Sequence, residues 1–246
     1  MENRNFRLDT QWNMIHYPDR PNGFGILILG DERHFVDKET SFWTQNEGKR
    51  ALLNDLKKAG YTIFYSNLYG LHWGSQKAVE LAQSLCAYIK RNEILNEKIH
   101  VLAEGMGALV ALKLIQTDTK IRSLLLINPI LSLKSHLQQE REHKFFYKKL
   151  LKEMSFSFNM HPEDIEALVE HNNGYEIPEL DNGIPVEIIH VLAGSRAYRQ
   201  SALINQYCLK WKEEGLPVSL LYMVPEKKPQ MGDKAVRFFK KQEAVL

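Results

Sequence analysis

Residues 100–112 form the stretch that most restricts the fold of this chain. They read HVLAEGMGALVAL, so an apolar run meets small residues and then continues as a second apolar run. Ala103 and Gly107 lie two positions on either side of Gly105, which is the spacing of a tight bend between a strand and a helix. Such a bend raises its central residue above the carboxyl edge of a sheet. The stretch therefore predicts a buried strand, a sharp turn at Gly105 and a helix.

The segments around this bend alternate between short apolar runs and longer amphipathic ones. Alternation of this kind requires a mostly parallel sheet with helices on both faces and right-handed crossovers. Residues 5–17 alternate loosely and predict one or two antiparallel strands. The other predicted strands are residues 24–30, 61–65, 99–102, 121–127, 185–192 and 217–224. The predicted helices between them are residues 48–60, 76–91, 107–115, 200–214 and 233–241.

The alternation stops after residue 129, and no strand pattern returns until residue 185. Residues 130–154 predict one amphipathic helix. A second helix is expected to start at residues 161–162, with Pro162 in its first turn, and to end at Gly174. We therefore expect one α/β domain made of residues 1–129 and 182–246, with residues 130–181 inserted as a small helical lid or cap.

The first helix of this insertion carries basic side chains between apolar ones, which leaves two interpretations open. In the first, it is a basic amphipathic surface that meets a protein partner or an anionic membrane. In the second, its apolar face packs on the domain and its charges face water. The acidic residues Glu140, Glu142 and Glu153 are interspersed among the basic ones and favour the second interpretation.

The order of these segments, together with the bend, resembles the α/β-hydrolase superfamily in its small bacterial esterase and lipase form. The resemblance implies a nucleophile at the centre of the bend, an acid in the loop after the strand at 185–192, and a histidine after the last strand. Those three places hold Gly105, Gly194 and the Lys228–Pro229 turn. None of these residues has the required side chain, and no histidine follows His190. The sequence thus predicts the fold together with the loss of the catalytic triad.

Two kinds of function remain open for such a chain. The first is a binding module without hydrolase activity, which takes a small ligand in the former pocket or a protein partner through the lid, or serves as a subunit of a larger complex. The second is an unconventional hydrolase of an ester or thioester that uses a displaced nucleophile such as Ser195. That chemistry needs a base and an orienting group within hydrogen-bond reach of the serine.

The expected contacts of a ligand lie around the bend. The backbone N–H of Met106 at a helix start, and the loop at Gly30 and Asp31, stand where the superfamily binds an oxyanion. The negative charge of Asp31 argues against a free anion there, so an open pocket and a filled one are both possible. The candidate ligand-binding residues are Gly30, Asp31, His34, His72, Glu104, Met106 and Ser195.

Composition excludes several other classes of function. A formal net charge of +2 over 246 residues is too mild for a nucleic-acid-binding face. Cys86 and Cys208 lie far apart, and the histidines of the insertion lack the HExxH spacing, so we expect no metal and no cofactor. No stretch has the apolar length of a signal peptide or a membrane span. The sequence-based expectation is a cytoplasmic protein with no transmembrane segment.

Overall fold

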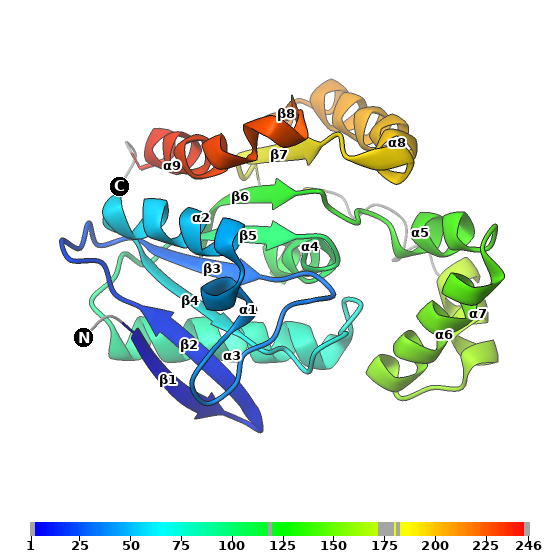
Figure 1. The fold of residues 1–246 in the computed structure, drawn as a ribbon, viewed down its shortest axis with the longest axis horizontal. Helices are drawn as coiled ribbons and strands as arrows, with labels where there is room; N and C mark the ends of the chain where they lie inside the picture. Colours follow the sequence, from blue (N-terminus) through cyan, green and yellow to red (C-terminus); the bar gives the residue numbers. More distant parts are fainter. Residues whose placement is uncertain (1–2, 118–119, 172–179, 181–182, 244–246) are drawn as a thin grey trace.

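A single sheet of eight strands runs through the computed structural model, which describes residues 3–117, 120–171, 180 and 183–243. The strand order is β1-β2-β4-β3-β5-β6-β7-β8 (Figure 1). Strands β3 to β8 pair in parallel, whereas β1 and β2 form an antiparallel hairpin that joins the sheet at β4. The predicted fold class is therefore confirmed. The strands are β1 Asn3–Leu8, β2 Gln11–His16, β3 Gly25–Leu29, β4 Thr62–Ser66, β5 Ile99–Glu104, β6 Ile121–Ile127, β7 Val186–Val191 and β8 Val218–Met223.

Helices cover both faces of this sheet, because its central strands are apolar on both sides. Every residue of β3 and β4 is buried, as expected for parallel strands in the middle of a sheet. Strand residues pack with α3, α4 and α8 on one face and with α1, α2 and α9 on the other. The core helices are α1 Phe42–Gln45, α2 Glu47–Lys58, α3 Gln76–Asn92, α4 Gly107–Thr117, α8 Gly194–Glu213 and α9 Met231–Lys241, with a 3-10 helix, η2, at Pro225–Gln230.

Three further helices lie together at one side of the core (Figure 1). They are α5 Leu133–Glu140, α6 Lys144–Phe158 and α7 Pro162–His171. Their apolar residues form a separate cluster that also takes in Trp73, Met106 and Leu109 from the core. This cluster attaches the three helices beside the start of α4, which is the helix that follows the predicted bend.

The structure corrects the prediction of one continuous helix over residues 130–154, because the chain turns between α5 and α6 at residues 141–143. Leu137 and Leu150 are both buried in the same apolar cluster. On a straight helix these two residues would stand about 20 Å apart, so a turn is needed to bring both into one cluster. The predicted end of the next helix at Gly174 lies outside the described residues.

Two predicted helix starts were also too late. Helix α8 begins at Gly194 instead of residue 200, and α9 begins at Met231 instead of residue 233. The first turns of α8 are polar, which hides them from a search based on apolar periodicity. Among the helices of the described residues, none combines the length and the apolar character needed to cross a membrane.

Candidate functional site

The predicted bend is present and is made possible by glycines. Strand β5 ends at Glu104, Gly105 follows with φ of +51°, and α4 begins at Gly107. A Cβ on Gly107 would lie 2.3 Å from the carbonyl oxygen of Leu29 in β3. That distance is far below van der Waals contact, so the close approach of α4 to β3 requires glycine at this position.

The side chain of Asp31 occupies the space where a nucleophile on the bend would stand. A Cβ on Gly105 would lie only 1.9 Å from Asp31 Oδ1 and 2.0 Å from Asp31 Cγ. The same Oδ1 accepts a hydrogen bond of 3.0 Å from the backbone N–H of Met106. The N–H group that the sequence predicted to be available for an anion therefore already binds a carboxylate of the chain itself.

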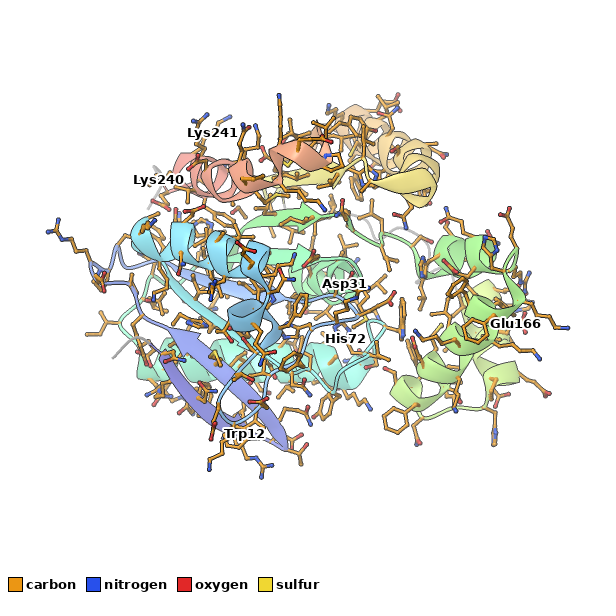
Figure 2. The ribbon with its side chains drawn as sticks, viewed as in Figure 1. Trp12, Asp31, His72, Glu166, Lys240 and Lys241 are labelled. Carbon is orange, nitrogen blue, oxygen red and sulfur yellow. The ribbon has the colours of Figure 1, made fainter. Side chains whose placement is uncertain are left out.

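A cavity of about 200 Å³ remains next to this carboxylate, at the carboxyl edge of the sheet. Asp31 lies at this edge, facing the helices α5 to α7 (Figure 2). The walls come from the ends of β3, β5, β6 and β7 and from the first turns of α8. Its polar lining includes Asp31, Glu32, Asn128, His190 and Gln200. The filled nucleophile position and the open cavity thus exist side by side.

His190 is a member of this lining and belongs to the strand predicted at residues 185–192. It is 1% exposed, and its Nε2 lies 2.9 Å from the carbonyl oxygen of Ala197. Its Nδ1 is buried and has no hydrogen-bond partner among the described residues. The end of the strand carried the signal, because side chains at the carboxyl edge of parallel strands face ligand sites in such sheets.

His34 and His72, predicted at the rim of the pocket, are buried and are absent from the lining of the cavity. His34 Nε2 donates to the carbonyl oxygen of Ser66 at 2.8 Å, and the His34 ring packs so tightly that a Cβ on Gly30 would lie 2.2 Å from it. His72 Nδ1 accepts from the N–H of Gly74 at 3.2 Å. These contacts give both rings a structural role, and any contact with a ligand stays a prediction.

Burial also sets the charge of these two rings. Desolvation lowers the pKa of His34 to about 4, against a hydrogen bond to the Ser66 carbonyl that raises it. Desolvation, with a further contribution from His34, lowers the pKa of His72 to about 3. Both imidazoles are therefore neutral at pH 7, and each would have to bind a proton when the chain unfolds in mild acid.

Glu104, the last residue of β5, points to α2 and forms an ion pair with Lys49. The two side chains are only 15% and 19% exposed, and the Lys49 ammonium also stands 5.1 Å from the centre of the Trp43 ring. Glu104 is absent from the cavity lining. Its geometry is that of a structural ion pair between the sheet and a helix.

Comparison of the backbone with those of known proteins supports the fold described above. No family model and no curated protein matches the sequence. The structure is similar to Est1E from Butyrivibrio proteoclasticus, with a TM-score of 0.64 and 13% identity over 99% of this chain and 100% of that one. It is similar to the Pyrococcus furiosus esterase Pf2001, with a TM-score of 0.58 and 15% identity over 98% and 91%. It is also similar to an acylaminoacyl peptidase from Pyrococcus horikoshii, with a TM-score of 0.67 and 14% identity over 98% of this chain and 42% of that one.

The strand order of the sheet, the bend at Gly105 and these structural neighbours all indicate the same fold. This chain has the α/β-hydrolase fold. At such low identity the likeness establishes the fold and leaves the activity of this chain open.

The two other residues that the sequence analysis assigned to triad places lie in the described part of the chain, and that assignment stays a prediction. Gly194 is the first residue of α8, has φ of +73°, and has open space where a Cβ would be. Lys228 lies in η2, after β8. The side chain of Ser195, the predicted displaced nucleophile, lies outside the described residues. Its role stays a prediction.

Proposed function

We propose that this α/β-hydrolase-fold protein is a binding module without hydrolase activity. The observation that carries the proposal is the position of Asp31, whose carboxylate takes both the space of a nucleophile on Gly105 and the N–H of Met106. Stabilising a tetrahedral intermediate requires that N–H to be free for a developing oxyanion. A carboxylate already bound there opposes the reaction through its charge and through its occupancy of the donor.

The glycines in the triad places support the same proposal. Gly105 offers no attacking oxygen or sulfur atom, Gly194 offers no acid, and Lys228 is no substitute for an imidazole base near neutral pH. The cavity of about 200 Å³ supplies a place for a small molecule. The proposed activity is therefore binding in the pocket where related folds perform catalysis.

Active-site labelling tests this proposal directly. The purified protein is treated with a broad-spectrum fluorophosphonate and followed by intact mass spectrometry, and hydrolysis of short-chain esters and thioesters is measured in parallel. We expect no adduct and no turnover above the buffer rate. A stoichiometric adduct that disappears in Ser195→Ala, but persists in the matched variant Ser201→Ala of the same helix, would establish the alternative hydrolase and refute the proposal.

The exposed face of α6 supports a second binding function, towards a protein partner. Phe145 and Phe156 are 75% and 78% exposed and lie on one face of the helix together with Lys149 and Lys152. Exposed aromatic residues of this size are typical of interaction surfaces. The intervening lysines favour a partner that surrounds an apolar patch with acidic side chains.

This surface is tested with a double variant, Phe145→Ser/Phe156→Ser, and a control, Ile94→Ser, which removes a fully exposed apolar side chain elsewhere. Complexes isolated by gentle lysis are analysed by native mass spectrometry at low and high salt. We expect a stoichiometric complex with an acidic partner for the wild type and the control, weakened by salt and absent for the double variant. A free monomer in every case, or the same complex for all three proteins, contradicts a docking role of α6.

A further inference from the structure

The two edge strands of the sheet differ in charge. The strand order leaves β1 at one edge and β8 at the other, and within the described part of the chain each has a strand neighbour on one side only (Figure 1). β1 carries Arg4 and Arg7, and charged side chains are a common protection against pairing with another chain. Residues 218–224 read VSLLYMV and carry no charge. The edge at β8 therefore lacks the protection that the edge at β1 has.

Apolar side chains are exposed along this uncharged edge. Tyr222 and Val224 are 42% and 44% exposed, and Leu209 of α8, the helix that packs against β8, is 52% exposed. Val224 continues the extended backbone of the strand, with φ of −78° and ψ of 151°. Exposed apolar side chains beside an uncharged strand edge are typical of a surface that pairs with another chain.

The hydrogen bonds between β8 and β7 determine which backbone groups of this edge face outwards. The carbonyl oxygen of Pro217 accepts from the N–H of Val186 at 2.9 Å, and that of Met223 accepts from the N–H of Leu192 at 2.8 Å. Alternate residues of a strand direct their N–H and C=O groups to the same side. Residues 217, 219, 221 and 223 therefore face β7, and the even-numbered residues between 218 and 224 face away from it.

The outward backbone groups form a set that is complementary to itself. The chain already uses two of them, because the N–H of Val218 donates to the carbonyl of Leu216 and the carbonyl of Val224 accepts from the N–H of Lys227. Within the described residues, donors then remain at 220, 222 and 224, and acceptors at 218, 220 and 222. When two β8 strands pair antiparallel about residue 221, position 220 faces 222 and position 218 faces 224 of the other copy. Every remaining donor meets an acceptor, whereas a register centred on 220 or 222 directs some of them to groups that are already used.

We propose that two copies of this chain form a two-fold dimer by antiparallel pairing of β8 with β8. The occupant of the edge is a second copy, because the free backbone groups complement themselves and an uncharged strand brings no like charges together. A β1–β1 pair would instead gather the arginines of both copies at one contact. The β8 contact uses the same surface on both copies, so it closes at two. This inference goes beyond the proposed binding function and involves neither the cavity nor α6.

Cross-linking tests the register, because residue 221 faces its own copy across the two-fold axis. The Cα atoms of such a non-hydrogen-bonded pair lie about 4.5 Å apart, which suits a disulfide. We expect Leu221→Cys, treated with diamide, to give a stoichiometric disulfide dimer in intact mass spectra that reductant reverses. In the matched control Ser219→Cys the two Cα atoms would stand about 13 Å apart, too far for a disulfide. The native Cys86 and Cys208 are buried, and the wild type reports any cross-link through them.

Sedimentation velocity over a concentration series measures the same contact without a cross-link. We expect the wild-type chain to form a reversible dimer at micromolar concentrations. Tyr222→Lys should weaken this dimer tenfold or more, because a lysine at the edge would lose water on pairing and bring two like charges close together. The control Asn3→Lys adds the same charge to the exposed first residue of β1 and should leave the dimer unchanged.

Three results would each overturn the inference: a monomeric wild type, a dimer that Tyr222→Lys leaves unaffected, or equal cross-linking through residues 219 and 221. Thermal melting shows whether each variant is folded. If a cysteine variant does not fold, sedimentation of the wild type and Tyr222→Lys decides the question. The dimer has twice the mass of the chain, which distinguishes it from a complex with a partner at α6 in native mass spectra.

Discussion

Replacing Gly105 tests the coupling between the centre of the bend and the side chain of Asp31, which fills the space beside it. A side chain at this position meets two penalties. The first is the backbone, because φ is +51°, and left-handed geometry costs a non-glycine residue about 1–2 kcal/mol. The second is Asp31, which must leave the N–H of Met106 because its Oδ1 lies 1.9 Å from the new Cβ. A hydrogen bond to a charged group contributes about 1.5–3 kcal/mol, and the partial exposure of Asp31 favours the lower end.

These terms predict that Gly105→Ala lowers the free energy of unfolding by about 2.5–4 kcal/mol. Asp31→Ala loses only the hydrogen bond, which costs about 1.5–2 kcal/mol. The double variant loses the same bond once, so it should cost no more than Gly105→Ala alone. The cycle should therefore be non-additive by about 1.5–2 kcal/mol.

Urea unfolding measures these differences, provided that the slope with denaturant concentration stays the same across the variants. Gly215→Ala is the matched control, because Gly215 also has positive φ, +79°, but open space at its Cβ. It should show the backbone cost alone. Equal losses for Gly105→Ala and Gly215→Ala, or an additive cycle, would refute the steric role of Asp31. Gly105→Ser should destabilise the fold in the same way and hydrolyse no ester.

Three other changes test the surroundings of the site. Gly107→Ala should unfold at a lower temperature and lose about 3 kcal/mol or more, because its Cβ would lie 2.3 Å from a β3 carbonyl that cannot rotate away; wild-type melting would contradict that contact. Lys49→Met should cost about 1–3 kcal/mol in urea unfolding by leaving Glu104, whose side chain is only 15% exposed, without its partner, and adding Glu104→Gln should recover part of the loss. Unfolding below pH 6.5 should take up a proton at His72, whose folded pKa is lowered to about 3, so stability falls as pH drops from 6.5 towards 3, by at most about 1.4 kcal/mol per pH unit. His72→Gln should reduce the slope of the free energy of unfolding against pH, whereas the exposed control His161→Gln should leave it unchanged. Identical slopes for the wild type and His72→Gln would refute proton uptake at His72.

Much of the architecture could be predicted because it depends on local patterns. The buried strands were visible as apolar runs, and the bend as small residues at a fixed spacing around Gly105. The turn at residues 141–143 was missed, because apolar periodicity continues across it and only the shared burial of Leu137 and Leu150 requires the break.

The site was harder to predict, because it depends on contacts between distant segments. Asp31 and Met106 are separated by 75 positions, and nothing in either segment alone shows that the carboxylate would reach the N–H of the bend. Loop positions suggested that His34 and His72 were accessible, whereas tertiary packing buries both rings. His190 was assigned to a strand, and its position at the end of that strand places it in the cavity wall.

The geometry makes the side chains at positions 31 and 105 mutually exclusive. A serine at 105 needs the volume that Asp31 fills, and an oxyanion formed from it would need the Met106 N–H that Asp31 already binds. A second negative charge about 4 Å from that carboxylate would raise the energy by about 4 kcal/mol at an effective dielectric constant of 20. Restoring the nucleophile alone therefore opposes catalysis sterically and electrostatically, even before the missing base is considered. The position of one carboxylate, Asp31, therefore accounts for the proposed loss of hydrolysis.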